Sequence, residues 1–468
     1  MGLSKDEEVA LQQKIPTFLK QPLLSGRFSS LSVRNEIRAA TESQTIDEII
    51  IPYIPSLKTL SLFLGVSAFS SVFDAPGESF RSIESVTLDL VGDRLRSIDW
   101  MLQRFGNTTT FQNATNLRKI DISGWRCSQE ISRIILSLRM PWNQLTSIRI
   151  MQLGMTIRHL KSILRQCVPL QEISTSFRYS PGDSIIAKAD EAADDQIDLP
   201  NLKFVELQGR QLPRTELVKH LQLPWEQLST LELLHFEDPI AGLDVYQVLQ
   251  RCARLERLSL MCPEKYFSNL PGGLLTLPRL KDLEIQTNGI FMLQKLKVPA
   301  LTSLRIISHL SFPATHVSDM IVRSGCYLTS ISQTGAFKCD DNMALRKLLP
   351  LLPSVSAFEL ESLLLDAWSF QTLGSGKVLP RLTGLGCGLE RDLVPYFLDF
   401  LDARMQDTKK NPKKFASLFR AKGYMENVED FSAIIDVAGG RLHRLSAEHG
   451  THFFLYTKAE SHGKKMGS

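Results

Sequence analysis

The phrase "PWNQLTSIRI" at residues 141–150 returns as "PWEQLSTLEL" at residues 224–233. In both copies a leucine is followed, three and five residues later, by two more aliphatic residues. The last two alternate with the period of a β-strand, so they face one side of a sheet while the residue between them faces the other. Tryptophan is scarce here, at 5 of 468 residues. Recurrence of the whole phrase therefore indicates two copies of one structural unit.

The same leucine pattern recurs along the chain, for example in "IPSLKTLSL" (54–62), "LPNLKFVEL" (199–207) and "LPRLKDLEI" (277–285). Most steps between copies span roughly 20 to 29 residues, the period of leucine-rich repeats. One strand cannot bury its apolar face alone, but stacked neighbours can. The first apolar residues of the copies, which we call anchors, are Leu57, Ile83, Leu117, Leu145, Leu170, Leu202, Leu228, Leu255, Leu280, Leu301, Leu328, Val355 and Leu382.

Segments between the strands have helical spacing, as in "TIRHLKSILRQC" (156–167) and "GLDVYQVLQRC" (242–252). The apolar residues expected on one face of each helix are Ile157, Leu160 and Leu164, and Leu243, Val245 and Leu249. Helices are about 10 Å wide and strands lie about 4.8 Å apart, so a stack with helices on one side must curve. The sequence predicts an α/β leucine-rich-repeat solenoid, a horseshoe with parallel strands on the concave face and helices on the convex face.

We expect the solenoid over residues 54–403, an N-terminal helical cap or linker over 1–53, and a last repeat or cap with a basic tail over 404–468. The net charge is +4, from 54 basic and 50 acidic residues, and the excess lies in the last of these segments. A near-neutral body argues against nucleic-acid binding. No apolar run reaches the roughly 18 residues of a membrane span, and we expect no membrane partner.

Tryptophans and cysteines recur at the turns that precede strands. Trp142 and Trp225 each stand three residues before an anchor. We expect them to cap the turn and pack in the core, with stacking on a ligand as the alternative. Cys167, Cys252 and Cys326 also precede strands, but stacking would hold them too far apart to share one zinc ion. Buried packing is the better interpretation.

The chain lacks the motifs of the common catalytic sites. "GSGKV" (374–378) lacks the first glycine and the closing Ser or Thr of a phosphate-binding loop. "HGTH" (449–452), beside His443, is better explained by surface imidazoles near a strand than by a metal site. We expect no catalytic residue, cofactor or metal, and a protein that is not an enzyme.

A partner is expected on the concave sheet, along the residues that stand between the two inward-facing positions of each strand. The candidates are Asp121, Arg149, Glu206, Glu232, Glu284, Arg305 and Glu359. Glu206 and Glu232 would lie side by side on adjacent strands, which costs up to about 1 kcal/mol. A basic peptide bound by Glu206, Glu232 and Glu284 would offset this repulsion. The alternative is a solvated acidic face.

The phrase "PW-x-Q-L-T/S-x-L/I", followed by a helix that ends as "LRQCVPLQEI" or "LQRCARLERLSL", resembles the repeat region of the fungal, chiefly basidiomycete, F-box-domain protein family. The resemblance covers roughly residues 54 to 460 and includes the closing segment "FLDFLDARMQDTKKNPKKFASLFRAKGY" (397–424). In that family an F-box docks on the adaptor of a cullin-RING ubiquitin ligase and the repeats present substrates. The resemblance implies a protein partner that is a ubiquitylation substrate.

Residues 1–53 depart from that family because they contain neither tryptophan nor cysteine, and only "IPTFLK" is reminiscent of an F-box. We therefore expect that the F-box was lost or lies upstream in a longer product, and that 1–53 do not dock on the adaptor. A free-standing repeat scaffold is the alternative. A third is a GTPase-activator-like regulator using Arg149 or Arg305.

Two charged segments remain open. The long step between Leu170 and Leu202 contains an acidic stretch within 186–199, and "KKNPKK" occupies 409–414. The first is expected to be a solvated loop or a second binding element, the second an exposed linker or a nuclear localisation signal. No secretory signal is present in the N-terminal sequence, so we expect a cytoplasmic protein, with the nucleus as the alternative.

Overall fold

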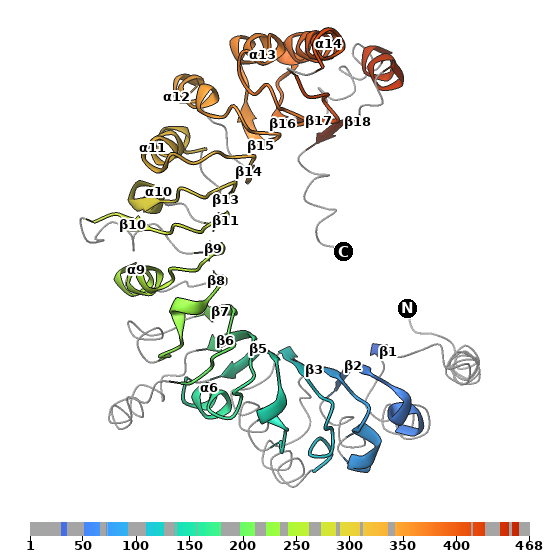
Figure 1. Cartoon of the computed structure of the whole chain (residues 1–468). Helices are drawn as coiled ribbons and strands as arrows, with labels where there is room; N and C mark the ends of the chain where they lie inside the picture. The colour runs from blue at the N-terminus through green and yellow to red at the C-terminus, as the bar shows by residue number, and fades with distance from the viewer. Residues whose placement is uncertain are drawn as a thin grey trace, which may run out of the picture. The chain divides into compact units, whose positions relative to one another are not determined.

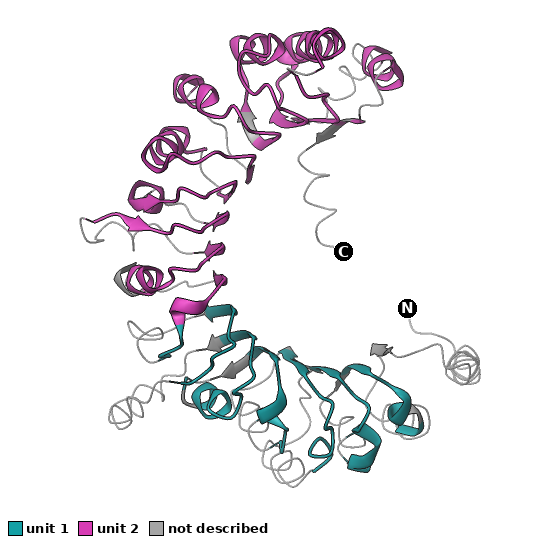
Figure 2. Cartoon of the chain, viewed as in Figure 1, with its two compact units in different colours: residues 1–224, 235–240 teal, residues 225–234, 241–468 magenta. Residues whose placement is uncertain are grey.

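The protein was analysed as a computed structural model, which divides into two compact units (Figure 2). Unit 1 comprises residues 1–224 and 235–240, and unit 2 comprises 225–234 and 241–468. The division falls inside the range expected as one solenoid. The structure describes residues 30–34, 51–65, 72, 74–91, 109–125, 135, 138–155, 157–178, 197–210, 221–234, 242–261, 273–286, 291–308, 312–335, 342–412, 415–425, 440–448 and 452–457.

Unit 1 contains a run of parallel strands in which each strand pairs with the next one along the chain. Helix α6 (Ile157–Leu164) connects two of them. Strand β1 pairs with β2 and was not predicted, because it lies within the segment expected to be a helical cap or linker. The strands are β1 (Ser30–Arg34), β2 (Thr59–Gly65), β3 (Ser85–Val91), β4 (Lys119–Trp125), β5 (Ser147–Met155), β6 (Glu172–Arg178) and β7 (Phe204–Arg210).

Unit 2 repeats this arrangement, again with parallel pairing between successive long strands. They are β8 (Thr230–Leu234), β9 (Arg257–Met261), β11 (Asp282–Gln286), β13 (Ser303–Ile307), β14 (Ser330–Thr334), β15 (Ala357–Leu364), β16 (Gly384–Gly388), β17 (Arg420–Met425) and β18 (His452–Thr457). A short parallel pair, β10 (Leu275–Thr276) and β12 (Leu296–Lys297), lies outside this sheet.

The labelled helices of unit 2 all lie on one side of its sheet (Figure 1). Parallel strands require such crossovers, because a chain must return to the same end before it can start the next strand. The helices are α9 (Gly242–Arg251), α10 (Phe291–Lys295), α11 (Ala314–Ser324), α12 (Asn342–Leu348), α13 (Ala367–Gly374) and α14 (Val394–Lys410). The predicted α/β class with parallel strands and helical connections is therefore confirmed.

The core of each unit is built from the predicted anchors and from the two aliphatic positions that follow them. Every anchor is at most 2% exposed. On β8, Leu231 and Leu233 are buried while Thr230, Glu232 and Leu234 are half-buried, the alternation expected of a sheet covered on one face. Two of the inner positions carry polar residues instead, Thr175 and Gln333, and both are buried.

The helical faces agree with the prediction where the structure describes their side chains. Leu160 and Leu164 of α6 are fully buried, whereas Ile157 is only half-buried. Val245 and Leu249 of α9 are buried, and the side chain of Leu243 lies outside the described part of the chain.

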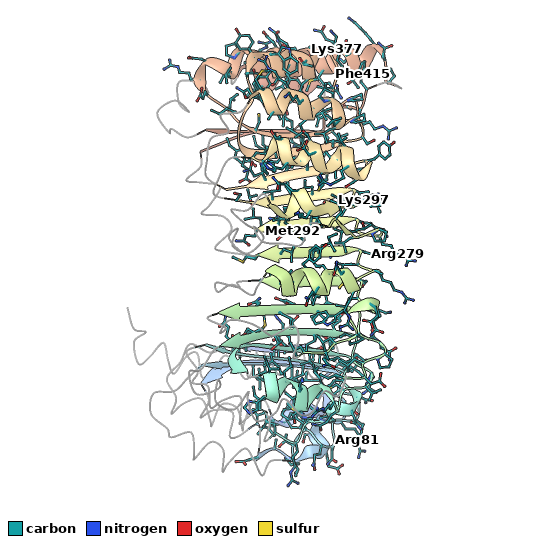
Figure 3. The ribbon with its side chains drawn as sticks, turned by 90° about the vertical axis from the view of Figure 1, so that its left-hand side faces the viewer. Arg81, Arg279, Met292, Lys297, Lys377 and Phe415 are labelled. Carbon is teal, nitrogen blue, oxygen red and sulfur yellow. The ribbon has the colours of Figure 1, made fainter. Side chains whose placement is uncertain are left out.

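A ladder of hydrogen bonds connects the turns before successive strands. In unit 2 the residues of this ladder are Thr302, Thr329, Ser356 and Thr383, which we call the hydroxyl ladder. Each uses both its backbone N–H and its side-chain hydroxyl to donate to the carbonyl one repeat earlier, at 2.7–3.1 Å. Arg279 and Lys297 lie at this turn-bearing edge and point outward (Figure 3). The ladder gives each strand the register of its predecessor.

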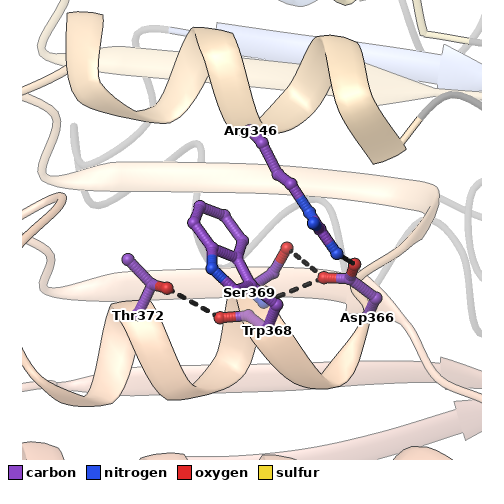
Figure 4. Close-up of polar contacts among 5 residues, drawn as sticks. All are labelled: Arg346, Asp366, Trp368, Ser369 and Thr372. Carbon is purple, nitrogen blue, oxygen red and sulfur yellow. Dashed lines mark hydrogen bonds and ion pairs between the residues drawn. The ribbon is translucent and has the colours of Figure 1, made fainter.

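Helices α12 and α13 are joined by a polar contact on the helical side of unit 2 (Figure 4). Asp366 caps α13 by accepting hydrogen bonds from the backbone N–H and the hydroxyl of Ser369, at 2.8 and 2.6 Å. Arg346 of α12 donates to the same carboxylate at 2.6 Å, and its guanidinium lies 4.8 Å from the ring centre of Trp368. Burial acts to raise the pKa of Asp366, but the hydrogen bonds from Ser369 and Arg346 outweigh it and the pKa is lowered.

The turn before β16 is held by a buried arginine from α14. Arg404 donates from Nη2 to the carbonyls of Leu379 and Pro380, at 2.9 and 2.6 Å, and lies 5.4 Å from the ring centre of Phe415. Gly376 is required beneath that ring, because its φ is +64° and a Cβ there would lie 2.2 Å from a Phe415 carbon. These contacts bring the start of β16, α14 and the segment before β17 together.

Candidate functional site

The outward-facing residues at the centre of successive strands form one in-register row in each unit. The row of unit 1 is Ser61, Thr87, Asp121, Arg149, Ser174 and Glu206. The row of unit 2 is Glu232, Ser259, Glu284, Arg305, Ser332, Glu359, Gly386, Lys422 and Phe454. We call these the central rows. Every predicted candidate residue lies on one of them.

In unit 1 the central row carries an internal ion pair. Arg149 Nη1 lies 3.4 Å from Asp121 Oδ2 on the neighbouring strand, and the arginine side chain is 53% exposed. Burial raises the pKa of Asp121, and the charges of Asp89 and Glu206 act in the same direction, whereas Arg149 lowers it. The acidic side chains of this face therefore affect one another, with Arg149 placed among them.

Glu206 ends the described row of unit 1 and is only 9% exposed. Its Oε1 accepts a hydrogen bond from Gln208 Nε2 at 2.7 Å, on the same face of β7. Glu232 starts the row of unit 2 and is half-buried, with Ser259 as its register partner on β9. Because these two glutamates belong to different units, their expected side-by-side placement stays a prediction.

In the middle of the unit 2 row, an acidic and a basic side chain of the row also pair with each other. Glu284 Oε2 lies 3.4 Å from Arg305 Nη1, and Ser259 donates its hydroxyl to Glu284 Oε1 at 3.5 Å. Both charged side chains remain partly exposed, at 34% and 44%. The surface available to a partner here is a pair of opposite charges rather than an isolated carboxylate.

Glu359 and Lys422 make a third pair, which crosses an intervening strand. Their side chains approach to 3.2 Å although β16 lies between β15 and β17. Gly386 is the register partner of both, and a Cβ there would lie 3.4–3.5 Å from the Cα, Cβ and Cγ atoms of Glu359. The two charges can meet because the strand between them carries no side chain at this point.

An aromatic and basic cluster follows at the end of the row. The rings of Phe419 and His452 lie 5.4 Å apart edge to face, and His452 stacks on Phe454 at 6.3 Å. The Arg420 guanidinium lies 5.9 Å from the Phe454 ring centre. We call these four residues the C-terminal cluster. Of these four residues, only His452 was considered from the sequence, as a surface imidazole near a strand. Aligning Leu418 as a further anchor would have placed Lys422 on the row.

The turn tryptophans pack as predicted. Trp142 is 6% and Trp225 1% exposed. The carbonyl oxygen of each tryptophan accepts a hydrogen bond from the backbone N–H of its anchor, Leu145 or Leu228. The alternative of stacking on a ligand is not supported by such burial.

The turn cysteines are buried as well. Cys167 and Cys252 occupy the tryptophan position in their own repeats, each three residues before an anchor, whereas Cys326 precedes its anchor by two. Each of the first two thiols contacts the carbonyl of the residue four earlier, at 3.1 and 3.2 Å. Burial raises the pKa of both thiols to about 12. Such thiols are poor metal ligands and nucleophiles at neutral pH.

The other segments considered from the sequence are only partly described. His443 is exposed in a helical turn and His452 belongs to the C-terminal cluster, while His449 lies outside the described residues. Gly374 of "GSGKV" ends α13. Residues 179–196, which contain most of the acidic stretch, and Lys413 and Lys414 of "KKNPKK" also lie outside. In the described part of the chain, no group of three or more potential metal ligands comes together.

Comparison with models of known protein families and with curated proteins finds no match to this chain. Among the described helices, none combines the length and the apolar composition needed to cross a membrane. The central rows and the C-terminal cluster therefore have to be interpreted from their own chemistry.

Proposed function

We propose that the chain is a leucine-rich-repeat protein of the horseshoe type, with strands on the concave face and helices on the convex face, which binds a protein partner through its central rows without catalysing a reaction. The observation that carries the proposal is the register of the rows. Neighbouring strands lie about 4.8 Å apart, so each row presents side chains at regular intervals on a sheet face opposite the helices. Variable residues on a rigid repetitive scaffold are the usual basis of recognition by solenoids.

The charge pattern of the rows refines the expected partner. Asp121, Glu284 and Glu359 each have a cation of their own within 3.4 Å. A uniformly basic peptide would have to compete with these cations for their carboxylates. A partner of mixed charge, with an anion opposite Arg149 or Arg305 and a cation opposite the neighbouring carboxylate, fits the rows better.

In the ubiquitin-ligase form of this proposal, the rows recognise the substrate of an F-box-type receptor, as the family resemblance implies. The alternative is a free-standing repeat scaffold or a regulator of another enzyme. Affinity capture followed by detection of the cullin-RING adaptor separates the two, because only a receptor that docks on the ligase retrieves the adaptor.

A pair of charge swaps tests the central row itself. Exchanging Glu284→Arg together with Arg305→Glu preserves the ion pair but reverses its direction. The matched control exchanges Glu256→Lys together with Lys281→Glu, a pair at 2.8 Å that lies at the turn-bearing edge rather than on the row. Partners are captured with the wild-type chain from cells that express it and identified by mass spectrometry.

We expect the row swap to reduce capture of the partner at least about tenfold, because like charges across an interface cost several kcal/mol. The edge swap should leave capture unchanged. Equal capture by the wild-type and both swapped chains would refute binding through the central row of unit 2.

A further inference from the structure

The C-terminal cluster stands out among the exposed side chains of unit 2. Phe419 is 63% and Phe454 38% exposed, and the neighbouring Arg420 and His452 are exposed as well. Large apolar side chains grouped at a surface are typical of interaction sites. Arg420 lies on β17, His452 and Phe454 lie on β18, and Phe419 directly precedes β17.

Phe419 departs from the pattern of its own position. It continues the hydroxyl ladder, because its backbone N–H donates to the Thr383 carbonyl as Thr383 does to Ser356. The four preceding positions carry serine or threonine, whose hydroxyls strengthen the ladder. Phenylalanine adds no such bond and leaves its ring in solvent. The edge-to-face contact with His452 is the only ring contact of Phe419 within the described residues, and most of the ring stays exposed.

Arg420 supplies a cation that no carboxylate of the described residues neutralises. Its register partners are Gly384 on one side and His452 on the other, and within the described residues it forms no ion pair. Lys422, two residues later, is already held by Glu359. The Arg420 guanidinium lies 5.9 Å from the ring centre of Phe454. A guanidinium in such a contact can still bind a carboxylate in bidentate fashion through its in-plane N–H groups.

We propose that the C-terminal cluster is a docking surface for an acidic peptide segment of a protein partner in which a carboxylate neighbours an aromatic or large aliphatic side chain. The carboxylate pairs with Arg420, and the apolar side chain packs on Phe419, His452 and Phe454. This inference rests on the proposed function and specifies the partner chemistry at one end of the unit 2 row. This peptide is negatively charged, whereas the peptide expected from the sequence is basic.

The test uses the full chain and three fluorescein-labelled twelve-residue peptides. One alternates Glu and Phe, one alternates Glu and Ser, and one alternates Lys and Phe. Fluorescence anisotropy should show the Glu/Phe peptide binding about tenfold more tightly than either of the others. Absence of Glu/Phe binding up to about 1 mM, equal binding of all three, or preference for the Lys/Phe peptide would each overturn the inference.

Variants localise the binding. Phe419→Ser restores the residue type of the preceding ladder positions and so preserves the fold, and it should weaken Glu/Phe binding about fivefold to tenfold. Arg420→Ala should weaken binding of the Glu/Phe peptide at least as much. Arg420→Lys should retain only part of the wild-type affinity, because a lysine cannot bind a carboxylate in bidentate fashion. The matched control is Arg257→Ala, an exposed arginine at the same strand position of β9 that pairs with Asp282 at 3.7 Å.

Arg257→Ala should bind the Glu/Phe peptide like the wild type. If Phe419→Ser and Arg420→Ala also bind like the wild type while retaining its circular dichroism and melting temperature, the cluster is not the docking surface. Failure of these peptide experiments together with a positive charge-swap result leaves the proposed function standing and removes only this inference.

Discussion

Gly386 shows how one residue without a side chain can determine a charge arrangement across three strands. Lys422 is 9% exposed, so its ammonium group depends on Glu359 for compensation. Any long side chain at Gly386 would stand between the two. Counting four residues on from the anchor Leu382 places this glycine on the row, but its role depends on Lys422 of β17, in the segment 404–468 that was expected to hold a last repeat or cap.

The two members of this pair should differ in their effect on stability. Glu359→Gln leaves a nearly buried ammonium group without its carboxylate and should cost about 1–3 kcal/mol in free energy of unfolding. Lys422→Met keeps the long apolar stem and leaves a glutamate whose side chain is 33% exposed to water. It should cost less than about 1 kcal/mol. Urea unfolding followed by circular dichroism measures both.

Glu256→Gln is the control, since its pair with Lys281 is about half exposed on both sides, so solvent screens the pair and the stability should stay close to that of the wild type. If Lys422→Met proves as damaging as Glu359→Gln, burial of the lysine is not what makes the pair important.

At the scale of single elements, α13 is held at its start by one carboxylate that serves two helices. Asp366 lies just before the helix and accepts from Ser369 in the manner of an N-cap, while Arg346 reaches it from α12. The motif D-x-x-S is visible in the sequence, but the arginine is 20 residues away. Arg346 contacts Asp366 only because successive repeats stack on each other.

Two substitutions separate the cap from the ion pair. Asp366→Ala removes both and should cost about 1–2 kcal/mol in free energy of unfolding. Asp366→Asn still accepts from the Ser369 N–H and loses only the charge opposite Arg346, whose side chain is 38% exposed, so it should cost less than about 1 kcal/mol. Urea unfolding compares them, and equal losses would show that the charge rather than the cap dominates.

The pH dependence gives an independent check. Because the pKa of Asp366 is lowered in the fold, its charge stabilises the protein above the ordinary pKa of aspartate, about 4, and this contribution is lost as the pH falls further. The stability difference between wild type and Asp366→Asn should therefore shrink below about pH 4.

Most strands and their inward faces could be predicted from the sequence, because the pattern L-x-x-L-x-L gives the position of the anchor and of the two inward-facing residues of the strand that follows it. Thr175 and Gln333 show where this fails, since polar residues replace the aliphatic one and the strand continues unchanged. Strand β1 was missed because the position three residues before Leu31 carries Phe28 in "FSSLSV" (28–33), whereas the anchors of the other copies are aliphatic. The candidate residues do share one register row within each unit, but the ion pairs among them depend on side-chain reach that spacing does not encode.

For the whole molecule, buried thiols should make stability fall at alkaline pH. Burial raises the pKa of Cys167, Cys252 and Cys387 to about 12. An unfolded thiol loses its proton near pH 8.5, whereas the folded one retains it. The stabilising contribution is therefore complete below that pH and declines as the pH rises toward 12.

Replacing Cys252 by alanine tests this directly. The variant should be less stable than the wild type at pH 7, and the difference should diminish between about pH 9 and 11, because alanine has no proton to lose. Met320→Ala, at another fully buried position, should show a constant loss over the same range. Urea unfolding at a series of pH values measures both, and parallel curves for the two variants would exclude the thiol as the cause.

The hydroxyl ladder has a consequence for how such a chain can evolve. Thr302 and Thr329 make the same two bonds to their predecessors, so the residues from one to the next form a cassette with matching ends. Duplicating or deleting a cassette changes the number of strands while every remaining junction keeps its geometry. Under the proposed function, the number of cassettes would set the length of partner that the sheet can contact, and point substitutions on the sheet would set the chemistry of that contact.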